Sequence, residues 1–350
     1  MPVRPERGTG FQPACGLQVR TPCRAPFLDV VVSELEFGRA TRQIPHAKVW
    51  TAAQLSSAPT FKRSLGGWAV ALLRHKKIRH VLVRGDFPLS AALFLKKHGI
   101  RVETGANVYP NRMIKTPEEI RKIRHVQRAA RVAVREATRL IKSSTIDGKG
   151  HLIADGKPLT SERVRERIRE TVLKFGCLDV GTIVAGGRQG ADPHEVGTGV
   201  LRANEFIVID VFPYHLEYGY WGDITRTVMR GKPTKEQARM YKAVAKAQRL
   251  GLSLVKPGAK CCDVHRRVAE CLKDAGFETT TCGEGGTPIG FFHGTGHGVG
   301  LEIHEAPSLS LRCDTVLKEG MVVTVEPGLY YPELGGVRIE DLVVVGKSKI

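Results

Sequence analysis

Long apolar runs and aromatic residues are both scarce in this sequence. No stretch approaches the roughly 18 consecutive apolar residues that a membrane-spanning helix needs. The basic N-terminus, MPVRPERGTGFQPACGLQV, has no apolar core of the kind that a secretory signal requires. These absences predict a cytoplasmic protein without a membrane partner.

Paired cysteines are also missing. The eight cysteines form no CxxC pair, and no spacing of histidine and cysteine is typical of a zinc module. We interpret them as reduced thiols, several of them on apolar helix faces.

Acidic residues are outnumbered, and the formal net charge is +19. Such a charge permits a nucleic-acid partner. The Arg and Lys residues are, however, spread along the chain, mostly on the polar sides of predicted helices, and aromatic residues amount to only 6%. We therefore interpret the charge as solvated surface rather than a nucleic-acid interface. A nucleic-acid role beside another function stays an alternative.

Three regions follow one another along the chain. Residues 1–25 are rich in proline and glycine, show no periodicity and are expected to be irregular. Residues 26–112 alternate between strand and helix patterns: a strand and helix in 26–43, a strand at 81–85, a helix ending at Gly99 and a further strand. The predicted third region, 113–350, is a separate domain.

The third region repeats one pattern. Thr116, Pro117 and Glu119 predict a capped helix start, and a second helix begins near Ser161. Strands then follow in GTIVAGG, NEFIVIDVFP and GYWGDITRTVM. A second helix pair, from Thr234 to about Val255 and from Cys262 to Ala275, precedes strands near 298–304, 321–331 and 336–346. This duplication predicts an α+β domain of two halves with a site between them.

Acidic residues interrupt or end several of these apolar strands. Asp210 ends IVID, and Asp223 lies on the returning strand. Two buried carboxylates cannot both stay ionised without a compensating cation. Glu326 ends the run MVVTV, and Glu340 lies inside GVRIEDLVVV. A plain ion pair with Arg338 would explain Glu340, but it would not explain the other acids.

Three histidines lie among four glycines in HGTGHGVGLEIHE: His293, His297 and His304. Glycines allow backbone segments or a ligand to approach closely. Together with the acids, this segment indicates a site rather than isolated structural histidines. A set of four carboxylates and one imidazole suits two hard or borderline divalent ions, which could activate a water for hydrolysis.

These motifs resemble the pita-bread-fold metallopeptidases, in the branch of creatinase, prolidase and aminopeptidase P. The resemblance covers about residues 113–346. Five family motifs occur in order along the chain, and each contains one metal ligand of the family: an aspartate at the end of a strand, D-[IL]-T-R-T (here DITRT), GHGxG, T-x-E-P-G and V-R-I-E-D. They give the metal ligands Asp210, Asp223, His297, Glu326 and Glu340.

The resemblance also implies a role for each ligand. Asp210 would bind one ion, His297 and Glu326 the other, and Asp223 and Glu340 both. Glu326 would in addition shuttle a proton for a metal-bridged hydroxide. Manganese is the expected metal, with cobalt, zinc or iron as alternatives.

Four further residues take roles from the same resemblance. His194 matches the histidine near the leaving side of the substrate, and His304 matches the one that hydrogen-bonds the scissile carbonyl, so both are expected to be catalytic and to bind substrate. His293 matches a further histidine of the substrate pocket. Arg338 would hold Glu340 in orientation without binding a metal ion itself.

The segment SELEFGRA resembles the N-terminal domain of the creatinase and prolidase branch, although here that domain is expected to be partial. This favours a peptidase that cleaves Xaa-Pro bonds, of aminopeptidase P or proline dipeptidase type, acting as a homodimer on a peptide substrate. Two alternatives remain: the same metal site acting on another amide substrate, and a pita-bread protein that binds partners without catalysis.

Overall fold

The computed structural model describes residues 28–55, 64–105, 109–280, 288–346 and 348–349. It divides the chain into two compact units, residues 1–110 and 111–350. The irregular segment expected at 1–25 lies outside the described residues. The assignment of domains to 26–112 and 113–350 stays a prediction, although the division between the units falls close to it.

The first unit contains two pairs of parallel strands, β1 with β2 and β3 with β4. A helix connects the two strands of each pair, as parallel neighbours require. The sequence pattern does not predict strand β2 or helices α2 and α3, which the structure contains. The elements are β1 (Asp29–Val32), η1 (Glu34–Glu36), α1 (Phe37–Gln43), β2 (Lys48–Thr51), α2 (Ala52–Leu55), α3 (Leu65–His75), β3 (His80–Arg84), α4 (Leu89–Lys97) and β4 (Arg101–Gly105).

The second unit repeats a helix pair followed by a sheet, as predicted. Its first half contains η2 (Pro110–Met113), α5 (Pro117–Ser143), β5 (Thr145–Ile146), β6 (Leu152–Ala154), β7 (Lys157–Pro158), α6 (Ser161–Leu173), β8 (Cys177–Leu178), β9 (Ile183–Gly186), η3 (Gly187–Ala191), β10 (Ile207–Val211), β11 (Tyr214–His215) and β12 (Ile224–Val228). Within it, β10 pairs with β9 and β12 in antiparallel register.

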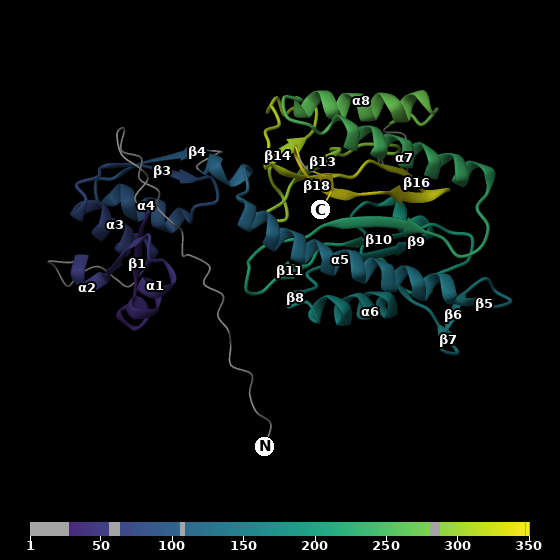
Figure 1. Ribbon diagram of the computed structural model, residues 1–350, viewed down its shortest axis with the longest axis horizontal. Coiled ribbons are helices and arrows are strands. Elements are labelled where there is room, and N and C mark those ends of the chain that lie inside the picture. Colours follow the sequence, from purple (N-terminus) through teal and green to yellow (C-terminus); the bar gives the residue numbers. More distant parts are fainter. Residues whose placement is uncertain (1–27, 56–63, 106–108, 281–287, 347, 350) are drawn as a thin grey trace, which may run out of the picture. The chain divides into compact units, whose positions relative to one another are not determined.

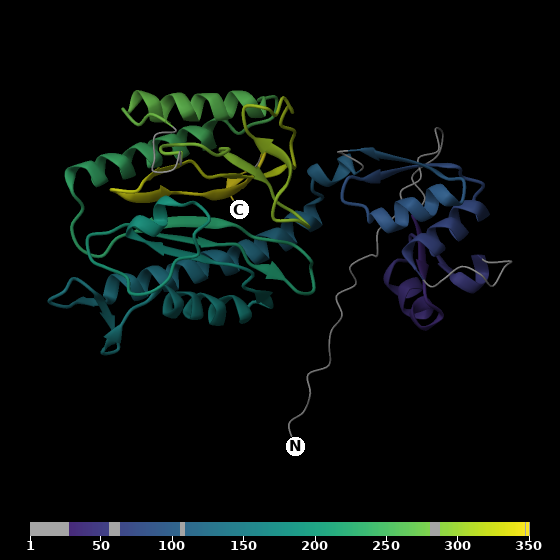
Figure 2. The same cartoon turned by 180° about the vertical axis from the view of Figure 1, so that it is seen from behind.

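The second half contains α7 (Lys235–Leu254), α8 (Cys261–Asp274), β13 (Gly296–Gly298), β14 (Glu305–Leu309), β15 (Val322–Val325), β16 (Gly328–Tyr331), β17 (Gly335–Arg338), β18 (Asp341–Val344) and β19 (Ser348–Lys349). Five strands form one sheet in the order β14-β13-β15-β18-β19, while β16 and β17 form a separate hairpin. Seen from either side, the β9–β10–β12 sheet and the five-stranded sheet lie between the α5–α6 pair and the α7–α8 pair (Figures 1 and 2).

Local sequence explains how the long helices begin. The Thr116 side chain accepts a hydrogen bond from Glu119 N–H, and the Glu119 carboxylate accepts one from Thr116 N–H, so the predicted capping box of α5 is present. Thr234 and Gln237 form the same box on α7. The apolar stripe of α5 is buried against β10 and β12, which places this helix behind the strands of the site. No helix in the described ranges is long and apolar enough to cross a membrane.

Three predicted strands are wrong. The strand expected near 298–304 is absent between Gly298, where β13 ends, and Glu305, where β14 begins, and two others are not continuous. The strand expected at 321–331 ends at Val325 and resumes at Gly328, and the one expected at 336–346 ends at Arg338 and resumes at Asp341. Strand β15, which precedes the first break, pairs with β18, which follows the second break. Strands β16 and β17, which lie between the two breaks, pair with each other. Glu326 and Glu340 therefore lie at the two corners where the chain passes between sheets. Pro327 has no N–H to continue a ladder, which explains the first corner.

Candidate metal centre

Two antiparallel strands hold the two aspartates. Asp210 lies in β10 opposite Thr225, and Asp223 directly precedes β12. The Gln127 side chain, from α5, brackets the backbone of Asp223: its Oε1 accepts from Asp223 N–H and its Nε2 donates to the Asp223 carbonyl, both at 2.7 Å. The position of Asp223 is thus fixed by helix α5 as well as by strand β12, which begins at the next residue.

Glycine allows β13 to bring His297 up to the neighbouring strand. A Cβ on Gly296 would overlap the carbonyl oxygen of Thr324, so the close approach of the two backbones needs glycine here. The His297 N–H donates to Thr324 Oγ1 at 3.0 Å. Its ring Nδ1 donates to the Gly298 carbonyl at 3.1 Å, which leaves Nε2 as the atom that faces the acids.

Three of the predicted ligands converge tightly. Ligand atoms of Asp223, His297 and Glu340 all lie within 4.8 Å of one another. His297 Nε2 is also 3.2 Å from Glu326 Oε1, and Thr324 Oγ1 donates to that same oxygen at 3.0 Å. The predicted ligands thus come from both halves of the second unit and face one interior.

Among the described residues, Arg338 forms no ion pair or direct hydrogen bond with Glu340, so the plain ion pair is wrong; the two are linked only through Thr225, whose Oγ1 accepts from Arg338 Nε at 3.3 Å. The Arg338 guanidinium donates to Asp210 Oδ2 at 2.9 Å and to the Tyr330 hydroxyl at 2.8 Å. The Glu340 Oε2 atom instead accepts from Thr225 Oγ1 at 2.7 Å. Arg338 is the last residue of β17 and Glu340 lies in the break before β18, so the strand alternation that would place them on one face does not apply.

Burial and crowding of like charges control the protonation of the acids. Burial, followed by the neighbouring carboxylates, raises the pKa of Asp223 and of Glu340 well above the ordinary range. For Glu326, burial is outweighed by the hydrogen bond and charge of His297, and the pKa falls to about 2. For His297, burial is outweighed by Glu326, and the pKa rises to about 9. The metal-free site therefore holds protons in place of cations.

Two buried carboxylate oxygens that lack a described hydrogen-bond partner indicate that these side chains suit metal ions. Asp210 Oδ1 and Glu340 Oε1 are buried and accept no hydrogen bond from any residue that the structure describes. A buried carboxylate oxygen without a partner is costly, and a cation removes that cost. Oxygen donors with one imidazole suit hard or borderline divalent ions.

The three remaining histidines of the predicted site differ in their surroundings. His304 is exposed, and its ring lies edge-on to the ring of His297 with centroids 4.3 Å apart. His194 lies exposed in a turn and interacts electrostatically with His293 and His304. His293 has both ring nitrogens engaged, with the Gly294 carbonyl at 2.7 Å and the Tyr330 hydroxyl at 2.9 Å. Burial lowers the pKa of His293 to about 4, so its ring is neutral at pH 7.

Comparison with known proteins identifies the family. The model of metallopeptidase family M24 matches residues 121–347, which is more than half of the chain. The chain belongs to metallopeptidase family M24. Membership implies that divalent metal ions are its cofactors.

Relatives of this M24 chain include peptidases of proline-containing substrates. It is 36% identical over 241 residues to the Xaa-Pro dipeptidase of Pyrococcus furiosus, which covers 68% of this chain and 62% of that relative. It is 31% identical over 255 residues to the uncharacterized peptidase YqhT of Bacillus subtilis, covering 72% of this chain and 68% of that protein. The match thus spans less than two thirds of the Pyrococcus dipeptidase.

Solved structures agree on the fold. The prolidase from Pyrococcus furiosus has a TM-score of 0.73 at 28% identity and covers 92% of this chain and 86% of its own. The Xaa-Pro dipeptidase from Bacillus anthracis has a TM-score of 0.79 at 26% identity, covering 98% and 88%. The predicted pita-bread fold is confirmed.

Several residues that organise the M24 site escaped the sequence reasoning. Thr225 and Thr324 lie inside motifs from which only the acids were selected, and Tyr330 lies two residues after T-x-E-P-G; each bonds a predicted ligand or Arg338. Gln127 carried a usable signal, because it is a polar residue within the apolar stripe of α5. A buried amide needs partners, and those of Gln127 are the backbone groups of Asp223.

Proposed function

We propose that this M24 chain is a peptidase that uses two divalent ions to hydrolyse the peptide bond before proline. One observation carries the metal part: two buried carboxylate oxygens, Asp210 Oδ1 and Glu340 Oε1, have no described partner in a cluster that also contains Asp223, His297 and Glu326. The names of the relatives support the substrate class, since two of those compared are Xaa-Pro dipeptidases and one is a prolidase.

In this proposal the five ligands are shared between two ions. Asp210 would hold one ion, His297 and Glu326 would hold the other, and Asp223 and Glu340 would hold both. Bound divalent ions supply Lewis-acid chemistry, which lowers the pKa of a water molecule and polarises a carbonyl group. Manganese is our preferred metal, because the donor set is rich in oxygen, with cobalt, zinc or iron as alternatives.

Residues of the chain would move the proton and hold the reacting groups. Glu326 is ionised at neutral pH and would take a proton from the attacking water and pass it to the departing proline nitrogen. His304, beside His297, would donate a hydrogen bond to the oxygen of the scissile carbonyl. His194 would contact the substrate on its leaving side, and Arg338 would fix the orientation of Asp210.

For His293 the proposed role is substrate positioning rather than proton transfer. Its ring is tied to Gly294 and Tyr330, and its low pKa keeps it neutral, so it offers the pocket an uncharged ring edge. A neutral, fixed ring suits contact with the apolar ring of a proline side chain.

One assay tests the proposal. The purified chain is stripped with a chelator, reloaded separately with Mn²⁺, Co²⁺, Zn²⁺ or Fe²⁺, and its metal content is measured by mass spectrometry. Each form is then given an Ala-Pro dipeptide, an Ala-Pro-Ala tripeptide and a Met-Ala-Ser tripeptide. We expect two ions per chain, cleavage of the proline substrates and little cleavage of Met-Ala-Ser.

The outcomes separate the alternatives. Failure to take up metal would overturn the metal site. Metal uptake with cleavage of Met-Ala-Ser alone would support a hydrolase for another substrate, and uptake without any cleavage would support a non-catalytic binding protein. Preference between the first two peptides distinguishes a dipeptidase from an aminopeptidase of type P. A homodimer is also proposed from the resemblance, and a cytoplasmic location from the sequence pattern; light scattering after size exclusion tests the first.

A further inference from the structure

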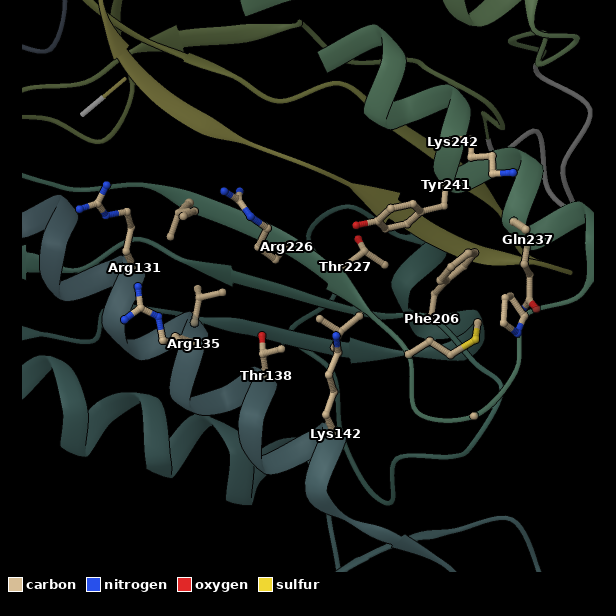
Figure 3. A pocket seen from close by; sticks show the side chains of 17 residues that line it. Arg131, Arg135, Thr138, Lys142, Phe206, Arg226, Thr227, Gln237, Tyr241 and Lys242 are labelled. Carbon is tan, nitrogen blue, oxygen red and sulfur yellow. The ribbon is translucent and has the colours of Figure 1, made fainter. Parts of the chain in front are cut away.

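A groove of about 670 Å³ lies between helices α5 and α7, with strand β12 at its floor. Figure 3 shows its labelled side chains converging from these elements. None of the eight carboxylate and histidine residues assigned to the metal and substrate sites is among its lining residues. The volume is that of a small-molecule site.

Positive charge dominates the lining. Five cationic side chains come from three elements, and no carboxylate lines the groove: Arg131, Arg135, Lys142, Arg226 and Lys242. Arg226 is paired with Asp341 at 2.8 Å. In contrast, Arg135, Lys142 and Lys242 form no ion pair with any residue in the described part of the chain.

Ion pairing varies along these two helices, and cations without an ion pair in the described part of the chain also lie outside the groove, such as Arg128 on α5 and Lys246 on α7. Other arginines on the same helices are neutralised by an acid one turn away: Arg139 pairs with Glu136 on α5, and Arg239 pairs with Glu236 on α7. A solvated helix surface usually interleaves its charges in this way. Unpaired cations gathered in a concave site instead focus a positive potential there.

The groove also has an apolar, aromatic end. The Tyr241 ring stacks on Phe206, with centroids 6.4 Å apart and planes 26° from parallel. Tyr241 is 38% exposed, so part of it remains open to a ligand. In Figure 3, Phe206 and Tyr241 lie at one end of the groove and Arg131 and Arg135 at the other. A matching ligand therefore carries a flat apolar body and more than one negative charge.

We propose that this groove binds a nucleotide, with its phosphates at Arg135 and Lys142 and its base against Tyr241. Several cations without acidic neighbours suit a polyphosphate better than a single carboxylate, and guanidinium groups match phosphate oxygens in geometry. Bases stack readily on aromatic side chains. A second copy of this chain is a poor occupant, because two identical basic faces would repel each other. Residues 1–27 carry four arginines and one glutamate, so their charge is also of the wrong sign.

Isothermal titration of the metal-loaded chain with magnesium-saturated ATP, at about 150 mM salt to screen weak surface contacts, tests the proposal. Magnesium-saturated tripolyphosphate reports the phosphate part alone, and a 12-nucleotide single-stranded DNA distinguishes a free nucleotide from a nucleic acid. The groove variant is R135E/K142E. The control R266E/R267E makes the same change in net charge at exposed positions of α8, outside the groove.

We expect R135E/K142E to weaken ATP and tripolyphosphate at least about tenfold, because removing one charge-assisted hydrogen bond typically lowers affinity by a factor of that order. The control should change both by less than about twofold. Tyr241→Ala should weaken ATP while leaving tripolyphosphate unchanged. Melting temperatures and metal content check that each variant is folded.

Three results would overturn the proposal. The first is no ATP binding by the parent chain. The second is equal weakening by the groove and control variants, which would indicate a diffuse charge effect. The third is ATP binding that persists in R135E/K142E but disappears on metal removal, which would place the phosphates at the metal centre. If the parent and the control bind the DNA tightly and the groove variant does not, the groove is supported as the site, and the nucleotide that it binds is part of a nucleic-acid strand.

Discussion

Replacing Arg338 with methionine removes a fully buried positive charge beside Asp210. The guanidinium donates to Asp210 at 2.9 Å and to Tyr330 at 2.8 Å, and its Nε donates to Thr225 at 3.3 Å. Loss of one member of a buried ion pair typically costs about 3–5 kcal/mol, because the remaining charge is left uncompensated. We expect the metal-free protein to lose unfolding free energy of this size. Bound divalent ions would balance Asp210, so the metal-loaded protein should lose less.

The measurement is thermal unfolding in excess chelator and in excess Mn²⁺. At about 2–4 °C per kcal/mol for a domain of this size, the melting temperature in chelator should fall by roughly 6–20 °C. Arg139→Met is the control, since Arg139 pairs with Glu136 on an exposed surface and should cost less than about 1 kcal/mol. A loss in chelator no larger than that of the control, or an equal loss with and without metal, would refute this account of Arg338.

Three further predictions concern the ligands. Thr225→Val removes the hydroxyl that bonds Glu340 at 2.7 Å, so we expect about 1–3 kcal/mol of destabilisation without metal by urea unfolding; an unchanged midpoint would contradict the assigned contact. His297→Ala should weaken metal binding by titration, whereas His304→Ala should mainly lower kcat; the reverse pattern would refute their roles. Because Asp223 and Glu340 have raised pKa values and His297 a pKa of about 9, the metal-free site carries protons at pH 7 that metal must displace. Metal affinity should therefore fall as the pH falls from about 9, with more than one proton released per chain in calorimetry across buffers; pH-independent affinity would contradict this linkage.

Local signals were reliable where a few neighbouring residues decide the conformation. The capping boxes at Thr116 and Thr234 place the starts of α5 and α7 correctly, because a side chain that satisfies nearby backbone N–H groups acts within one turn. The four glycines among the histidines likewise predict close approach of backbone segments, and Gly296 is one of them. The structure supplies the partner, which is the backbone of Thr324.

Pairings between distant segments were harder to predict. Alternation along a strand suggested that Arg338 and Glu340 share a face, yet the chain changes sheets between them, and Arg338 bonds Asp210 from another strand. The same change of sheets separates β15 from β16 at Glu326. Local sequence does not specify which strand becomes the neighbour, because that depends on how two sheets close around one core.

The sequence by itself determined the family, the helix-pair-plus-sheet repeat and the acids and histidine that are proposed as ligands. It could do so because motif spacing and apolar periodicity are local properties. Only the tertiary structure decided which groups hold those ligands: Thr225 for Glu340, Arg338 for Asp210, and Gln127 for Asp223. Each contact joins residues about a hundred positions apart, and the physical reason is that a buried polar group takes whichever partner the folded chain brings within reach.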